Sequence, residues 1–127
     1  MDTPGLNHVI LTISDLARSR EFYGGLLGFT LLDVPANPGA GFYFETGGTT
    51  FWFFPSKRPA EGDRFSEYRI GLDHLGFAAP NKEALERLAE KLMAAGVETS
   101  GVERFFTGNW YVAFRDPDNI QLEYWLP

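Results

Sequence analysis

Cysteine is absent from this sequence, and basic residues and long apolar runs are scarce. Without cysteine the chain cannot form disulfides, a thiolate nucleophile, a Cys-based zinc site or an iron–sulfur cluster. Lys and Arg number 11 against 17 Asp and Glu, a formal net charge of −6, which argues against a nucleic-acid or anionic-membrane partner. No apolar run approaches the ~18 residues of a membrane helix, and no signal peptide is visible at the N-terminus. We therefore expect a cytoplasmic protein.

Aromatic residues, by contrast, are abundant. The 127 residues include 12 Phe, 5 Tyr and 3 Trp. A chain of this length fits one domain with a real hydrophobic core. Because bulky aromatic side chains must either fill a core or line an apolar cavity, we expect them in both places.

A short motif occurs twice and marks an internal repeat. Residues 5–8 (GLNH) recur as residues 71–74 (GLDH). Each copy opens an apolar stretch of strand length, 6–13 in the first half and 72–79 in the second, and a helix-like segment follows each stretch. The chain therefore begins the same structural unit twice.

The two predicted helices have recognisable ends. Ser14 or Asp15 can cap the first, which is expected to continue to about Leu27. Asn81 can cap the second and Gly96 can end it, and apolar residues recur in it at i, i+3, i+4, i+7 and i+8. Each half thus contributes one amphipathic helix.

Three predicted strands follow each helix, separated by Gly, Pro and Asn breaks. They cover residues 30–34, 42–46 and 49–54 in the first half, and 97–105, 110–114 and 119–126 in the second. Residues 116–119 (DPDN) are expected to form only a turn. The pattern predicts an α+β fold of two βαβββ modules, about 5–55 and 70–127, joined by a linker at 56–69 within one domain, 1–127. A curved mixed sheet is expected to surround a shared cleft.

The only two histidines, His8 and His74, occupy matching places in the repeat. Side chains alternate between the two faces of a strand. If Val9 and Leu11 face the helix in one module and Leu75 does so in the other, both histidines face the cleft. Two imidazoles that converge in a cleft are a candidate metal site.

Glu123 is the candidate third ligand. Alternation along the last strand places Gln121, Glu123 and Trp125 towards the cleft. A carboxylate in such an apolar strand should be neutralised, paired or bound to a cation. Two histidines and one carboxylate leave coordination positions open for a substrate. Alone, either histidine would more often be a hydrogen-bonded core residue and Glu123 a surface residue, but their shared phase favours the metal site.

The chain resembles the vicinal oxygen chelate superfamily, the glyoxalase, bleomycin-resistance and extradiol dioxygenase proteins. The resemblance extends from Leu6 to Leu126. It rests on residues 6–9 (LNHV), 14–16 (SDL), 22–23 (FY) and 27–29 (LGF) in the first module, and on 73–77 (DHLGF), 114–119 (FRDPDN) and 122–123 (LE) in the second.

The resemblance implies a divalent metal, Fe, Mn, Zn, Ni or Co, bound by His8, His74 and Glu123, with Glu123 also the catalytic residue. In the glyoxalase I branch a fourth ligand lies on the fourth strand. Here the counterpart of Glu123 is expected to be Phe51 or Phe53, so the site resembles the three-ligand dioxygenase, epimerase and fosfomycin-modifying branches. The resemblance also implies a homodimer.

The expected activity is that of a metal-dependent enzyme, an oxidoreductase of the dioxygenase type, a lyase, an isomerase or an epimerase, acting on a small, partly apolar substrate with vicinal oxygens. Alternatives are a metal-free drug-binding protein of the bleomycin-resistance type and a purely structural or dimerising module. The predicted substrate-binding residues are Phe51, Phe53, Trp110, Gln121 and Trp125. Candidate general bases are Tyr43, Glu45, Tyr111 and Gln121. Candidate anion-binding residues are Arg69, Arg104 and Arg115.

Overall fold

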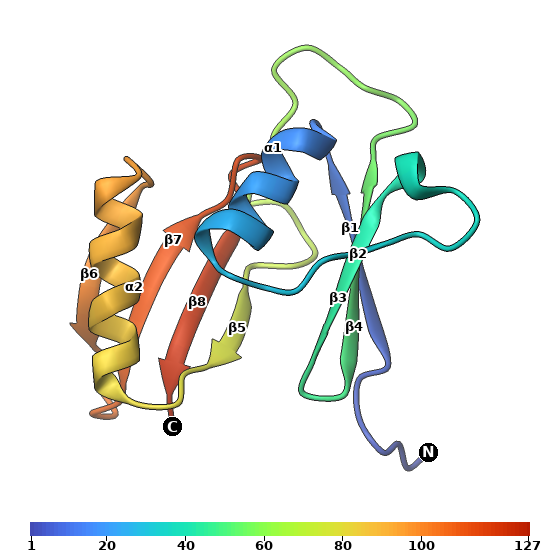
Figure 1. Ribbon diagram of the computed structural model, residues 1–127. Coiled ribbons are helices and arrows are strands. Elements are labelled where there is room, and N and C mark those ends of the chain that lie inside the picture. The colour runs from blue at the N-terminus through green and yellow to red at the C-terminus, as the bar shows by residue number, and fades with distance from the viewer. The chain divides into compact units, whose positions relative to one another are not determined.

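The computed structural model describes residues 1–127, which divide into two compact units, Met1–Asp63 and Arg64–Pro127 (Figure 1). Unit 1 contains β1 (His8–Ile13), α1 (Leu16–Arg20), the π-helix η1 (Glu21–Leu26), β2 (Leu32–Asp33), the short 3₁₀ helix η2 (Pro38–Ala40), β3 (Phe42–Thr46) and β4 (Thr49–Pro55). Unit 2 contains β5 (Leu75–Ala78), α2 (Lys82–Ala94), β6 (Thr99–Arg104), β7 (Trp110–Arg115) and β8 (Gln121–Leu126). The two predicted βαβββ-like modules of an α+β fold are confirmed.

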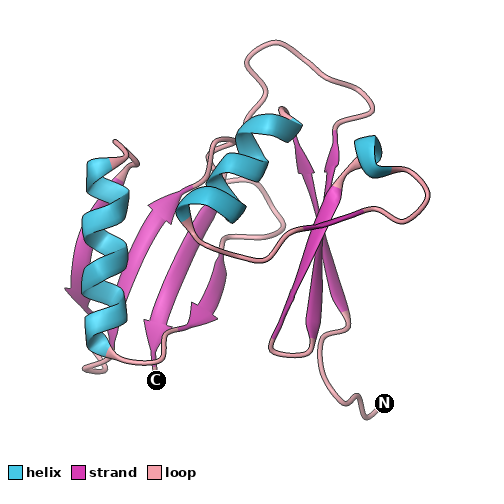
Figure 2. Cartoon of the chain, in the orientation of Figure 1, coloured by secondary structure: helices cyan, strands magenta, loops and turns pink.

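Each unit has its own mixed four-stranded sheet. The single curved mixed sheet expected from the sequence is therefore replaced by two sheets. The strand order is β1-β4-β3-β2 in unit 1 and β5-β8-β7-β6 in unit 2. In both sheets the first strand of the module runs parallel to the last, and the remaining pairs are antiparallel. The segment between β4 and β5 has no helix or strand (Figure 2). The repeat in the sequence is therefore a repeat of topology.

The first predicted helix is interrupted. Asp15 caps α1, its carboxylate accepting from the backbone N–H of Arg18 at 3.0 Å. After Arg20 the helix widens into the π-helix η1, and the N–H of Leu27 donates to the carbonyl of Phe22, five residues back, at 2.9 Å. Gly24 lies in η1, where an added Cβ would come within 2.8 Å of the side chain of Leu31. A larger residue at position 24 would therefore require the Leu31 side chain to move.

Aromatic rings form the core of unit 1. Tyr23 of η1 packs on Phe53 of β4, with 4.4 Å between ring centroids. Phe42 of β3 also stacks on Phe53, with 4.6 Å between ring centroids. All three side chains are fully buried. The helical segment and the sheet of this unit are thus joined by ring contacts, which are favourable both for the area they bury and for their geometry.

In unit 2 the helix α2 covers one face of the sheet, over β6 and β7 (Figure 1). Asn81 caps it, its side chain accepting from the N–H of Ala84 at 2.8 Å. Leu85 and Leu92 of α2 are buried, and so are Val112 and Leu122 of the sheet. The longest helix of the structure is this one, with 13 residues, and no helix is long and apolar enough to cross a membrane.

We predict that Ser19→Ala stabilises the protein. The hydroxyl of Ser19 is buried in unit 1 without a hydrogen-bond partner, and an unpaired buried hydroxyl costs about 1 kcal/mol or more. Urea unfolding should show a free energy of unfolding about 1 kcal/mol higher than wild type. The control is Ser66→Ala, because that hydroxyl accepts from the N–H of Tyr68; it should show no gain. A loss of stability in Ser19→Ala would contradict the prediction.

Candidate functional site

One face of the sheet of unit 2 faces away from α2, and we call it the open face of unit 2. Val112, Phe114 and Leu122 point to the α2 side and are buried. Because side chains alternate along each strand, their neighbours point the other way. The open face is formed by Tyr111, Ala113, Arg115, Gln121, Glu123 and Trp125, paired across β7 and β8 as Tyr111 with Trp125, Ala113 with Glu123, and Arg115 with Gln121.

His74 and Glu123 meet on this face. His74 directly precedes β5, and the parallel pairing of β5 with β8 places Gly76 opposite Glu123. The Nε2 of His74 lies 3.4 Å from Oε2 of Glu123. The Glu123 side chain is only 14% exposed, and the amide of Gln121 approaches it no closer than 3.5 Å. A largely buried carboxylate therefore has an imidazole nitrogen beside it.

The other ring nitrogen of His74 is held by Asp73. The Nδ1–H donates to the Asp73 carboxylate at 2.6 Å, since a carboxylate can only accept. His8, the first residue of β1, repeats this arrangement in unit 1, with Nδ1 2.7 Å from the side-chain oxygen of Asn7. In both histidines Nε2 is left for another partner, as in imidazoles that bind metals through one nitrogen and are oriented through the other.

The donor pair of unit 2 fits a metal ion. Two ligands that bind one ion at about 2.1 Å with tetrahedral angles lie about 3.4 Å apart, the separation of His74 Nε2 and Glu123 Oε2. Imidazole and carboxylate suit several divalent first-row metals. His8 belongs to unit 1, and no three His, Asp or Glu side chains gather at one point in the structure. The structure therefore brings two of the three predicted ligands together.

Three of the predicted substrate-binding residues point to the side of the sheet that is covered by the core or by α2. Phe51 and Phe53 are 6% and 0% exposed in the core of unit 1, and Trp110 has Lys82 of α2 over its ring at 4.3 Å. These orientations correct the prediction. In β4 and in β7, the alternate residues that face the core are displaced by one position from those expected. Gln121 and Trp125 lie on the open face, and their role in substrate binding stays a prediction.

The same shift corrects the counterpart of Glu123 in unit 1. In the β1–β4 register Ile10 pairs with Trp52, and in the β5–β8 register Gly76 pairs with Glu123. Ile10 and Gly76 each lie two residues after a histidine. The position equivalent to Glu123 is therefore Trp52, not Phe51 or Phe53. An indole has no lone pair to offer a metal, so unit 1 supplies no carboxylate or amide at this place.

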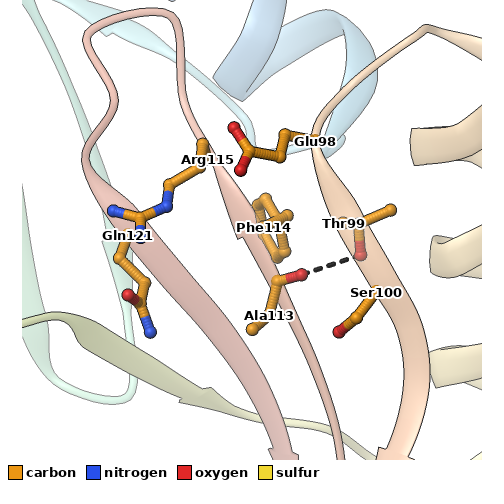
Figure 3. Close-up of a pocket in the computed structure, with 7 residues that line it drawn as sticks. All are labelled: Glu98, Thr99, Ser100, Ala113, Phe114, Arg115 and Gln121. Atoms are coloured by element: carbon orange, nitrogen blue, oxygen red, sulfur yellow. Dashed lines mark hydrogen bonds between the residues drawn. The ribbon is translucent and has the colours of Figure 1, made fainter.

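A hollow of about 350 Å³ lies at the end of the open face that carries Arg115 and Gln121 (Figure 3). Its lining was not predicted, apart from Gln121 and Arg115; the remaining residues are Glu98, Thr99, Ser100, Ala113 and Phe114. The register of β6 shifts between Thr99 and Val102 beside it, and Gly101 in this irregularity has φ of +80°. A glycine inside a predicted strand was the signal in the sequence for this irregularity.

The comparison with known families decides the relationship. A model of the glyoxalase/bleomycin resistance protein/dioxygenase superfamily matches residues 5–124. The chain belongs to this superfamily. The resemblance seen in the sequence is thereby confirmed over nearly its whole length.

Relatives of similar length extend the match. A glyoxylase/bleomycin resistance protein/dioxygenase domain from Frankia sp. EAN1pec is 32% identical, with 98% of each chain covered and a TM-score of 0.83. The uncharacterised protein YqjT of Bacillus subtilis (strain 168) is 28% identical over 96% of this chain and 98% of its own. MhqO of the same organism, a proposed ring-cleaving dioxygenase, is 30% identical over 95% of this chain, which spans 39% of MhqO.

Three of the candidate bases and anion-binding residues already have partners, and two others are exposed. Tyr111 donates its hydroxyl to Glu103 at 2.7 Å, and this hydrogen bond, with burial, raises the pKa of Tyr111 above its usual value of 10.0, so the phenol keeps its proton. Tyr43 stacks on Trp52, with 4.3 Å between centroids, and Glu45 is exposed. Arg104 lies over the ring of Trp110, and Arg69 is exposed.

Arg115 is occupied by Glu67. Its guanidinium donates two hydrogen bonds to the carboxylate, at 2.7 and 3.0 Å, the bidentate geometry of strong ion pairs. The hydrogen bonds from Arg115 lower the pKa of Glu67 from 4.5 to about 2. The pair fastens the segment before β5 to the end of β7, together with the N–H of Phe65, which donates to the carbonyl of Asp118 at 2.9 Å. Arg115 is thus structural.

We predict that, through the Arg115–Glu67 pair, the free energy of unfolding falls as the pH falls from about 5 towards 2. A carboxyl whose pKa is lowered by folding contributes stability above its unfolded pKa of about 4.5, and the contribution is lost as pH falls towards 2. Urea unfolding of wild type and Glu67→Gln should differ most above pH 5, and the difference should shrink steadily below it. Arg115→Gln should show the same dependence. A difference that stays constant between pH 5 and 2 would refute the assignment.

Proposed function

We propose that this protein is a metal-dependent enzyme that binds a divalent cation through His74, Glu123 and His8, with a small-molecule substrate that carries vicinal oxygens. The observation that carries the proposal is the approach of His74 Nε2 to Glu123 Oε2 at 3.4 Å. Membership of a superfamily that includes dioxygenases supports it. The cation is one of Fe, Mn, Zn, Ni or Co, which these ligands do not discriminate.

A bound divalent ion would act as a Lewis acid and stabilise negative charge on a substrate oxygen. The chain's own residues would do the rest. Asp73 and Asn7 hold the two imidazoles with Nε2 outward. Glu123 would supply the anionic ligand and, as the catalytic carboxylate, an acceptor for a substrate proton. A ligand set of two histidines and one carboxylate leaves positions for the substrate.

The type of reaction follows from what unit 1 lacks. With Trp52 in the place equivalent to Glu123, the proposed site has three protein ligands, and we propose a reaction of the dioxygenase, lyase, isomerase or epimerase type. The relative MhqO, a proposed ring-cleaving dioxygenase, supports the first of these. A metal-free binding protein of the bleomycin-resistance type is the alternative.

The proposal predicts close to one metal ion per chain in protein purified anaerobically without chelators or a His-tag. His74→Ala, Glu123→Ala and His8→Ala should each lose most of it, because each removes one of three ligands. Elemental mass spectrometry measures the content, and far-UV circular dichroism checks that the variants fold. The matched control is Glu86→Ala, which removes an exposed carboxylate on α2 and should leave the metal content unchanged.

The result would go against the proposal if wild type bound no metal even after reconstitution with each candidate ion. Binding of aromatic ligands by such metal-free protein would favour the alternative.

The predicted homodimer allows a second experiment, in which two variants are mixed. If two chains share the site, mixing His8→Ala with Glu123→Ala protein restores metal binding, because one intact ligand set forms between the two variants. If each chain holds its own site, the mixture stays empty.

Asp73 is predicted to set the affinity of the site. Residues that orient a metal-binding histidine typically contribute 10–100-fold to affinity, and Asp73 holds Nδ1 of His74 at 2.6 Å. Asp73→Ala should raise the metal dissociation constant by about that factor, measured by calorimetry with Zn²⁺ or Mn²⁺. Asp63→Ala, in the segment between the modules, is the matched control. Equal affinities for Asp73→Ala and wild type would show that the hydrogen bond does not orient the ring.

A further inference from the structure

Four aromatic side chains gather at the end of the open face of unit 2 that adjoins the β6–β7 turn. Tyr111 and Trp125 are cross-strand neighbours on that face. Phe105 follows β6, and its ring contacts both. Phe106 lies 4.3 Å from Phe105 between ring centroids and is 89% exposed. Exposed rings in such a cluster are typical of a binding surface rather than of a core.

The rings point in two nearly perpendicular directions. Tyr111 and Trp125 are almost parallel, 25° apart with centroids at 5.6 Å. Phe105 stands at 67° to Trp125 and at 83° to Tyr111, with centroids at 5.2 and 6.1 Å. We call these three residues the aromatic corner. A planar ring that enters it can extend the parallel stack and meet Phe105 edge to face, the two favoured geometries of aromatic pairs.

Charge on the open face selects against anions. Glu123 lies two residues from Trp125, Glu103 accepts from the hydroxyl of Tyr111, and Glu98 lines the hollow at the far end. The one guanidinium of this face, Arg115, already pairs with Glu67. The cations Lys82 and Arg104 lie over Trp110, on the α2 side. An anionic ligand would therefore meet the negative charge of these carboxylates.

The corner is close to the proposed metal ligands. Trp125 and Glu123 point to the same face of β8 and are about 7 Å apart along the strand. A single aromatic ring fills most of that distance. Oxygens that reach Glu123 and His74 must then be attached to the ring or lie within a bond or two of it.

We propose that the aromatic corner binds an uncharged planar aromatic group of the ligand, with the ligand's vicinal oxygens on that ring or within about two bonds of it. The position of the oxygens rests on the proposed function. The ring binding does not, because Phe105, Tyr111 and Trp125 need no metal to hold it.

The test uses the metal-free protein and two probes with the same ring system, 2-naphthol and 2-naphthoate, titrated at pH 7 by calorimetry. We expect 2-naphthol to bind, with its ring-current shifts on the Trp125 indole N–H in ¹⁵N-correlated NMR spectra. The charged 2-naphthoate should bind at least about fivefold more weakly, because of the nearby carboxylates. Trp125→Leu and Phe105→Leu should each raise the dissociation constant for 2-naphthol by about fivefold, because each variant loses one aromatic contact.

Two further variants make the result decisive. Trp125→Phe keeps a ring and should retain most of the affinity, which separates ring contact from damage to folding. Tyr68→Leu removes a tyrosine of the same unit that is 92% exposed outside the corner and should change nothing. Unchanged affinity in both leucine variants, or tighter binding of 2-naphthoate, would overturn the proposal while leaving the metal experiment untouched. Loss of metal binding with intact 2-naphthol binding would instead count against the proposed function alone.

Discussion

The parallel pairing of β5 with β8 is the constraint on which the candidate site depends. It sets Gly76 opposite Glu123, and because His74 lies two residues before Gly76 on the same face, the imidazole and the carboxylate must approach each other. A slip of one residue in this register would turn Glu123 towards α2, where a carboxylate would have only apolar neighbours.

Much of this could be predicted from the sequence, because the relevant signals are local and occur twice. The repeated motif before each first strand, the caps Asp15 and Asn81, and the left-handed Gly96 define the modules without tertiary information. Alternation sufficed for β8, where Leu122 and Glu123 differ so strongly in polarity that the phase is unambiguous. The pairing of Glu123 with His74 in one unit follows from that phase.

The failures have a common physical cause. In β4 every residue of the run from Phe51 to Phe54 is aromatic, so apolarity cannot reveal which rings face the core. In β7 both Trp110 and Tyr111 are amphipathic; Trp110 shares the face of the buried Val112 and Phe114, and Lys82 lies over its ring. The π-helix η1 and the bulge in β6, where Gly101 has φ of +80°, have no periodic signature in the sequence. Arg115 was recognisable as part of a turn, but its partner Glu67 is distant in sequence.

The two copies of the repeat have therefore diverged in chemistry while keeping their topology. Both keep a histidine oriented through Nδ1, by Asn7 in one and Asp73 in the other. A charged acceptor makes the stronger hydrogen bond to an imidazole, so the copy with Asp73 also holds its ring more firmly, and it is this copy that carries Glu123. In the other copy Trp52 replaces the carboxylate. If a metal binds His74 and Glu123, unit 2 supplies its anionic ligand as well as an aromatic surface on the same face. The division of roles is set by a single position in the β1–β4 and β5–β8 registers, tryptophan in one and glutamate in the other.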